Sequence, residues 1–254
     1  MRPHSGLIDG VEFADNPEPR CPCLLLLDTS GSMRGERINS LNEGLRTFHR
    51  ELLGDSLASR RVEVAVVTFD SAVRVVQPFV TAERFTPPLL TASGGTSMGA
   101  GIDQALTLVE KRKAIYVKHG VPYYRPWILM ITDGKPEGEP PAIVAHAQRR
   151  LVAAEERKGA VLFTVAVEGA DMAALRRLVP REPYELERLQ FSDLFVWLST
   201  SMQMVSHSKD GDTVDLPPVG WMKQLAQFID RHEHTIADGA RIIRILSKVA
   251  LGIY

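Results

Sequence analysis

The sequence predicts an α/β fold, a Rossmann-like, doubly wound and mostly parallel sheet with one antiparallel edge strand, followed by a helical C-terminal tail. Two observations carry this prediction. Short, continuous apolar runs stop abruptly at an aspartate, as at 23–28 and 127–133, which is typical of parallel strands buried on both faces. Segments with apolar residues three and four positions apart separate these runs, which indicates helices that pack on the sheet.

The elements follow in order along the chain. The runs 62–69 and 73–79 are separated only by Asp70-Ser71-Ala72, so we expect them to form a hairpin that supplies the antiparallel strand. The other apolar runs alternate with helical patterns, which favours parallel connections. Strands are predicted at 23–27, 62–69, 73–79, 127–132, 161–167 and 186–189, and helices at 38–52, 102–113, 141–158, 171–179 and 191–206.

Composition divides the chain into four parts. Residues 1–20 are polar and rich in proline and glycine, and we expect an irregular lead-in. Residues 21–207 hold the alternating pattern and form the predicted domain. Residues 208–220 have the composition of a linker, and 221–254 carry recurring apolar residues that predict a helical tail. We expect this tail to dock on a second protein or on another copy of the chain.

Overall composition excludes several classes. With 254 residues, 44% of them hydrophobic and 24% charged, the chain is typical of a globular protein. A net charge of -1 predicts no nucleic-acid binding. Its two cysteines, Cys21 and Cys23, are too few for a disulfide framework, and a bridge across one residue would be strained. No apolar run precedes Leu24 and none reaches the about 18 residues of a membrane span, so we expect a cytoplasmic protein.

Oxygen-bearing side chains lie in three predicted loops, after the first strand, before the helix at 102–113 and after the strand at 127–132. Ligands of open α/β sheets bind outside the carboxyl ends of the strands, so we expect these side chains to meet there. Carboxylate and hydroxyl oxygens suit Mg²⁺, with Mn²⁺ or Ca²⁺ as alternatives, whereas Zn²⁺ favours Cys or His. The predicted metal ligands are Asp28, Ser30, Ser32, Thr96 and Asp133.

Four further residues are expected to support these loops. Gly31, Gly95 and Gly134 relieve steric limits on backbone approach, and Asp70 lies in the hairpin turn near the predicted site. Each motif alone also fits a purely structural role. The first loop can cap a helix, Thr96 can cap the helix that follows it, and Asp-Gly is a common turn. The coincidence of three separated loops favours the metal site.

An enzyme that uses the same metal is the alternative from another class. A metal-dependent phosphatase would use the first aspartate as nucleophile and would need a second acid two residues later, where this chain has Ser30. The sequence also lacks a phosphate-binding Gly-x-x-x-x-Gly-Lys-Ser/Thr loop and a Gly-x-Ser-x-Gly elbow. None of the three loops contains a histidine to act as a base. We therefore expect a binding module without catalytic activity.

The motif Asp28-x-Ser30-x-Ser32, followed by Thr96 and Asp133, resembles the metal-ion-dependent adhesion site (MIDAS) of von Willebrand factor A domains. The resemblance covers roughly residues 20–205. It implies that the three hydroxyls coordinate a cation directly or through water, while the two carboxylates hold coordinating waters. It also implies that an Asp or Glu of a partner protein completes the coordination.

Within that family the chain is similar to the bacterial intracellular branch, on the basis of the Leu-Leu-Leu-Asp-Thr-Ser-Gly-Ser-Met stretch at 25–33 and the Ile-Thr-Asp-Gly stretch at 131–134. Its length and the Thr-Asp-Gly-Lys-Pro stretch at 132–136 point to a narrower group. It looks most like the proteins encoded beside tellurium-resistance and chemical-stress genes. This similarity implies an adaptor in stress response or defence, with kinase-like or phosphatase-like partners. An adaptor subunit of an ATPase machine remains the alternative.

Overall fold

The computed structural model describes residues 13, 15–134, 138–209, 212 and 214–218. Its strands are β1 (Cys21–Asp28), β2 (Val62–Phe69), β3 (Val73–Thr81), β4 (Trp127–Thr132), β5 (Val161–Ala166) and β6 (Tyr184–Glu185). Its helices are α2 (Glu36–Leu53), α3 (Ala58–Arg61), α4 (Met98–His119), α5 (Pro141–Glu156), α6 (Met172–Leu178) and α7 (Phe191–His207). Two 3-10 turns, η1 (Gly31–Met33) and η2 (Ala82–Arg84), follow β1 and β3. The predicted tail at 221–254 lies outside the described residues.

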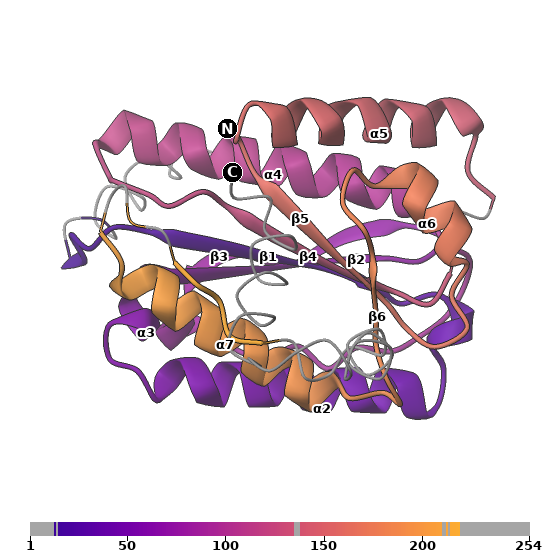
Figure 1. The fold of residues 1–254 in the computed structure, drawn as a ribbon, viewed down its shortest axis with the longest axis horizontal. Coiled ribbons are helices and arrows are strands. Elements are labelled where there is room, and N and C mark those ends of the chain that lie inside the picture. Colours follow the sequence, from indigo (N-terminus) through magenta and orange to yellow (C-terminus); the bar gives the residue numbers. More distant parts are fainter. Residues whose placement is uncertain (1–12, 14, 135–137, 210–211, 213, 219–254) are drawn as a thin grey trace, which may run out of the picture.

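The strands form one mixed sheet in the order β3-β2-β1-β4-β5-β6 (Figure 1). Strand β1 is central and pairs in parallel with β2 and β4, and β5 and β6 continue the parallel arrangement. Strand β3 runs antiparallel to β2 at the edge of the sheet. The predicted fold class, a mostly parallel sheet with one antiparallel edge strand, is confirmed for this part of the chain.

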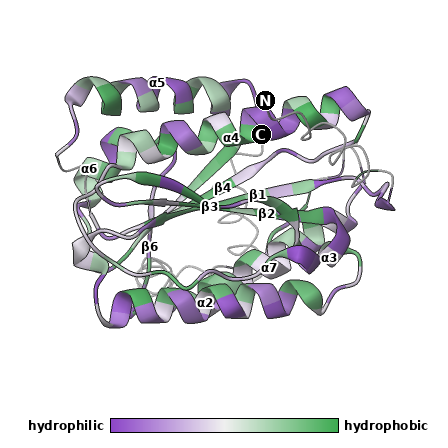
Figure 2. Ribbon diagram, turned by 180° about the vertical axis from the view of Figure 1, so that it is seen from behind, coloured by the Kyte–Doolittle hydropathy of each residue, from purple (hydrophilic) through white to green (hydrophobic). Residues whose placement is uncertain are grey.

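Helices cover both faces of the sheet, which explains why β1, β2, β4 and β5 are buried at every position and mostly apolar. Helices α2, α3 and α7 lie on one face, and α4, α5 and α6 lie on the other (Figure 1). Side chains of β1 alternate between the two cores, because Leu25 and Leu27 pack toward α2 and α7 whereas Leu24 and Leu26 pack toward α4. The polar residues of the helices lie mostly on their outer sides (Figure 2).

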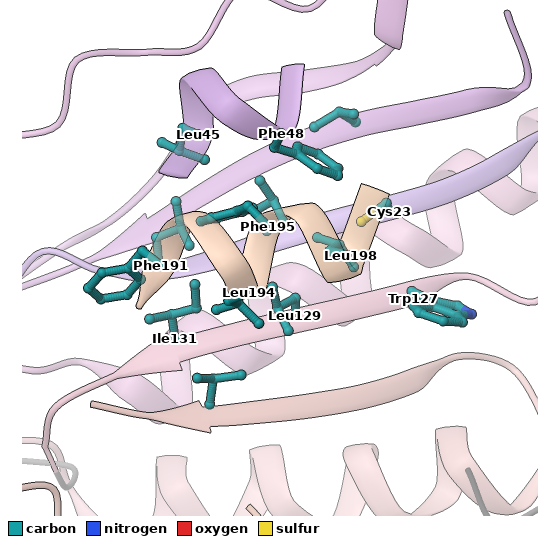
Figure 3. Close-up of a cluster of buried hydrophobic side chains, with 14 of the residues drawn as sticks. Cys23, Leu45, Phe48, Trp127, Leu129, Ile131, Phe191, Leu194, Phe195 and Leu198 are labelled. Atoms are coloured by element: carbon teal, nitrogen blue, oxygen red, sulfur yellow. The ribbon is translucent and has the colours of Figure 1, made fainter. Parts of the chain in front are cut away.

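Helices α2 and α7 approach closely at Gly44. The ring of Phe195 lies over this glycine, so that a Cβ added there would be 2.5 Å from the Cδ2 atom of Phe195 and 3.1 Å from the Cβ atom of Phe191. Phe48 packs against the same ring, with ring centroids 5.6 Å apart (Figure 3). A glycine in the middle of α2 is therefore required by packing.

Most predicted elements agree with the structure to within a few residues, but the predicted strand at 186–189 is wrong. The last strand is β6, which pairs with Val165 and Ala166 of β5. The next residues turn away, since Arg188 and Leu189 have φ angles of 46° and 56°. Leu186 still donates its backbone N–H to the carbonyl of Ala166 in β5 over 2.8 Å and is buried in the core, so the pairing ends at this residue.

The described residues of the predicted lead-in are docked on the domain at the edge of the sheet where β1 and β2 begin. Arg20 donates from Nε to Oε1 of Glu63 over 3.0 Å, and Arg112 donates from Nη2 to the same oxygen over 2.7 Å. Tyr116 donates its hydroxyl to the other carboxylate oxygen. Both guanidinium groups lie 5.2 Å from the ring centroid of Phe13. These contacts anchor the residues before β1 to the helix and strand behind them.

Part of the predicted linker also packs on the domain. Trp197 of α7 donates its indole N–H to the carbonyl of Pro217 over 2.9 Å, and Leu216 is buried in the core beneath α7. Tyr124 donates its hydroxyl to the carbonyl of Ser208 over 2.6 Å. Among the described helices, none is both long enough and apolar enough to cross a membrane.

Candidate metal centre

Asp28 is the last residue of β1 and lies at the base of the candidate site. Its Oδ1 atom accepts from the backbone N–H of Ser30 over 2.8 Å, and its Oδ2 atom accepts from the hydroxyl of Thr132 over 2.6 Å. Burial raises the pKa of Asp28, although the hydrogen bonds from Ser30 and Thr132 oppose this effect. A fully buried carboxylate that still has acceptor capacity is a ready partner for a cation or its bound water.

Ser30, Ser32 and Asp133 form a chain of oxygen atoms above Asp28. The hydroxyls of Ser30 and Ser32 are hydrogen-bonded at 3.0 Å, and Ser32 donates to Oδ1 of Asp133 over 2.7 Å. The 3-10 turn η1 makes this possible, because it turns the chain directly after Ser30 and so directs two hydroxyls to one side. Ser32 is exposed whereas Ser30 and Asp133 are buried, so the cluster opens to solvent on the Ser32 side.

The second loop lies against the first. The backbone N–H of Gly31 donates to the carbonyl of Gly94 over 2.9 Å, and the N–H of Ser93 donates to the carbonyl of Thr29 over 2.8 Å. A Cβ at Gly31 would lie 3.2 Å from the Gly94 carbonyl oxygen, so a side chain here would push the loops apart. The predicted role of Gly31 in a close backbone approach is thus consistent with its position.

Thr96 is buried and faces the third loop. A Cβ added to Gly134 would lie 4.0 Å from both Oγ1 and Cγ2 of Thr96, so these two residues are in van der Waals range of each other. The third loop is positioned in turn by a hydrogen bond of 3.2 Å from the N–H of Gly134 to the hydroxyl of Thr132. Asp28 ends β1, and the other four predicted ligands therefore lie in three loops that meet at the carboxyl edge of β1 and β4.

The glycine next to the predicted Gly95 carries the stronger backbone constraint. Gly94 has a φ angle of +76°, and a Cβ there would lie 2.4 Å from the hydroxyl oxygen of Ser71. Gly95 donates its N–H to the same oxygen over 2.8 Å. A Cβ added to Gly134 would make only ordinary van der Waals contacts, so packing does not require a glycine at this position.

Asp70 supports the loops from the hairpin side. Its Oδ2 atom accepts from the hydroxyl of Thr29 over 3.2 Å and from Nη1 of Arg74 over 2.6 Å. Its Oδ1 atom accepts from the N–H of Ala72 over 2.9 Å, and its carbonyl accepts from the N–H of Ser97 over 2.8 Å. Asp70 thus links the β2–β3 turn to the first and second loops, in agreement with a supporting position.

Two charged residues that sequence reasoning did not single out hold the loops of the site: Arg37 contacts the site directly, and Glu139 contacts the start of α4 beside it. Arg37, in the first turn of α2, pairs with Oδ2 of Asp133 and also donates to the carbonyls of Ser32 and Glu168, over 3.2 and 2.9 Å. Glu139 accepts from the N–H groups of Gly99 and Ala100 at the start of α4, over 2.7 and 2.9 Å. Glu139 therefore ties the segment that follows Asp133 to the helix that follows Thr96.

The donor set fits a hard divalent cation. It comprises two carboxylates and three hydroxyls, without imidazole or thiolate. In the described part of the chain no three His, Cys, Asp or Glu residues gather as a metal site, so a cation here would depend on the hydroxyls. Cys21 and Cys23 lie buried in the apolar core, and burial raises the pKa of Cys21 to about 12, which disfavours the thiolate that a metal requires.

A doubly wound α/β domain with a cluster of hydroxyls and carboxylates at the carboxyl edge of its sheet belongs to the class of α/β proteins that bind their ligands at this edge. The family model for the von Willebrand factor type A domain matches residues 24–190. The chain therefore belongs to the von Willebrand factor type A family. Domains of this family commonly bind a divalent cation at the MIDAS and use it in protein interactions.

Individual relatives agree with this assignment. The chain is 34% identical over 119 residues to calcium-activated chloride channel regulator 1 of Macaca mulatta, an alignment that covers 44% of this chain and 12% of that protein. The solved von Willebrand factor type A protein of Catenulispora acidiphila has a similar fold, with a TM-score of 0.56, 18% identity and coverage of 73% of this chain and 43% of that one. The chain thus spans less than half the length of either protein.

A third relative has a metal in its structure. Proximal thread matrix protein 1 from the mussel byssus, solved with a zinc-occupied MIDAS motif, has a similar fold with a TM-score of 0.50 and 16% identity. The similarity covers 73% of this chain and 48% of that one.

Proposed function

We propose that this chain is a non-catalytic module that binds a partner protein through a divalent cation. The cation would be held by Ser30, Ser32 and Thr96, with Asp28 and Asp133 holding its water molecules. Once bound, it would supply a coordination position for an Asp or Glu carboxylate of the partner. The surrounding residues hold and orient these donors.

The observation that carries this proposal is the hydrogen-bonded chain from Ser30 through Ser32 to Asp133 at 3.0 and 2.7 Å, with Asp28 beneath it. Three loops far apart in sequence direct oxygen atoms to one place that is open to solvent at Ser32. A helix cap or a turn would not need two buried carboxylates there. Because few of these ligands are charged, the site would retain electrophilic character toward an incoming carboxylate.

The donor chemistry favours Mg²⁺, with Mn²⁺ or Ca²⁺ as alternatives. In the mussel protein a zinc ion occupies the MIDAS motif, so a relative accepts a cation outside this set. We further propose that the module is a cytoplasmic adaptor of a bacterial stress-response or defence system with kinase-like or phosphatase-like partners. An adaptor subunit of an ATPase machine is the alternative.

Titration calorimetry of metal-stripped protein with Mg²⁺ and Mn²⁺ tests the site. We expect binding by the wild type, and its loss in a variant that combines Asp28→Ala with Ser30→Ala. Ser32→Ala is a second variant with little effect on folding expected, because the residue is exposed. Ser59→Ala on α3 is the matched control, since its hydroxyl bonds only locally to the carbonyl of Ser56. Equal binding by the wild type and both site variants would refute the assignment.

The absence of catalytic activity is tested separately, with a chromogenic phosphate monoester and Mg²⁺ or Mn²⁺ in excess. We expect no turnover above the rate of the Asp28→Ala, Ser30→Ala variant. Turnover by the wild type that this variant lacks would replace the binding module with the phosphatase alternative.

A further inference from the structure

Arg37 is the one arginine of the described residues that pairs with a predicted metal ligand. Its guanidinium group is held by Asp133 and by two carbonyls, those of Ser32 and Glu168. The Asp133 side chain is 0% exposed and that of Arg37 is 33% exposed. The arginine is thus fixed at the margin of the site, between the buried carboxylate and solvent.

This contact changes the charge of the site. The two carboxylates of the donor set, Asp28 and Asp133, carry two negative charges, and Arg37 compensates for one of them. Asp133 also accepts from Ser32 through its other oxygen, so both of its oxygen atoms are engaged. Counted over Asp28, Asp133 and Arg37, the site has one net negative charge before a divalent cation binds and one net positive charge afterwards. The guanidinium group of Arg37 then repels the bound cation. Arg34, whose Cζ atom would lie 4.0 Å from a Cβ at Gly31, adds positive charge at the same loop.

We propose that Arg37 makes cation binding depend on the partner's carboxylate. This proposal rests on the proposed function of the same site. By lowering the affinity for the cation alone, Arg37 leaves a site that binds the cation firmly only when a carboxylate ligand supplies the missing negative charge. Metal and partner would then bind cooperatively, each raising the affinity for the other by the same factor.

Bracing and charge compensation predict opposite signs for the removal of Arg37. If the arginine only braced the loops, its loss would free Asp133 and weaken cation binding. If its charge opposes the cation, its loss strengthens cation binding, although the brace is lost too. Arg37→Met keeps the length and the apolar stem of the side chain without its charge, and Arg37→Lys keeps the charge.

The test is calorimetric titration with Mn²⁺ of the metal-stripped wild type, Arg37→Met and Arg37→Lys, each with and without acetate as a minimal carboxylate probe. Arg46→Met is the matched control, because Arg46 lies on the same helix and pairs only with the exposed Glu43. We expect Arg37→Met to bind Mn²⁺ about tenfold more tightly than the wild type, which corresponds to about 1.4 kcal/mol. Arg37→Lys and Arg46→Met should stay close to the wild type.

Acetate should raise the Mn²⁺ affinity of the wild type more than that of Arg37→Met, since the variant no longer needs the added negative charge. The role of Arg37 would be overturned if Arg37→Met binds Mn²⁺ as tightly as the wild type or more weakly. The proposed function would still stand in that case, provided that the wild type binds Mn²⁺ and the Asp28→Ala, Ser30→Ala variant does not. If neither the wild type nor Arg37→Met binds Mn²⁺ with or without acetate, the metal site itself is wrong. Thermal unfolding in chelator verifies that each variant is folded.

Discussion

Replacement of Gly44 by alanine separates helix propensity from packing, because the two effects have opposite signs. Gly44 lies in the middle of α2, where alanine is the better helix former by about 1 kcal/mol. The ring of Phe195 occupies the space that a Cβ would need, at 2.5 Å from Cδ2 and 2.9 Å from Cε2. Neither distance is compatible with an ordinary carbon–carbon contact.

The magnitude follows from what the ring can do. Phe195 is fully buried and lies between α2 and the sheet, beside Phe48, so its ring cannot swing out to make room. Forced insertion of a methyl group into such a core costs about 1–3 kcal/mol, and the short distance places this site at the upper end. After subtraction of the propensity gain, we expect Gly44→Ala to lower the free energy of unfolding by about 2 kcal/mol.

Urea unfolding followed by far-ultraviolet circular dichroism measures this difference. Asn39→Ala is the control, since Asn39 is an exposed position of the same helix where only propensity changes, and it should raise the free energy of unfolding by about 0.5 kcal/mol. A Gly44→Ala protein as stable as the wild type, or more stable, would refute the close α2–α7 contact. A changed m-value would indicate that the variant alters more than this contact.

Three further predictions concern charged and reactive groups. Glu139→Ala should lower the free energy of unfolding by about 1–2 kcal/mol and weaken Mg²⁺ binding, because the start of α4 loses two hydrogen bonds to a carboxylate. Glu139→Gln should have an intermediate effect. Urea and calorimetric titrations that match those of the wild type would contradict this prediction. Cys21 and Cys23 should resist alkylation by iodoacetamide in the native protein and react in denaturant, because both are buried and burial raises the pKa of Cys21 to about 12. Mass spectrometry measures the labelling. Rapid labelling of the native protein would contradict this prediction. Burial raises the pKa of Asp55, but amides at the start of α3 and His207 lower it more, so the pKa lies below its ordinary value. The stability that Asp55 contributes relative to Asp55→Asn should be full above the ordinary pKa of an aspartate and disappear as the pH falls through the folded value; a pH-independent difference in urea midpoints would exclude this.

The sequence predicts most of this fold because burial on both faces leaves an unambiguous pattern. Strands such as β1 and β4 are buried at every position and are apolar up to their last residue, whereas amphipathic helices need apolar residues only on one side. The misplaced strand at 186–189 shows the limit of that signal. Leu186 is apolar because it fills the core, whereas Arg188 and Leu189 adopt left-handed backbone conformations that no apolar pattern reveals.

The five candidate ligands could be named from sequence because each lies at the end of a recognisable strand or in a loop directly beside a recognisable strand or helix. Their role in metal binding stays a prediction. Arg37 and Glu139 could not be found in the same way, since a charge in a first helical turn or in a polar loop is indistinguishable from a solvated one. Their contacts join residues 96 and 40 positions apart in the chain, so only the folded topology brings them together.

The position of α7 has a consequence for where this chain can be divided. The region matched by the family ends at residue 190, one position before α7 begins, yet Phe191, Leu194 and Phe195 complete the core between α2 and the sheet (Figure 3). A fragment trimmed to the matched region would present that apolar surface to water and invite aggregation. The region that matches the family therefore ends before the region that folds cooperatively. A minimal fragment for biophysical work has to include α7.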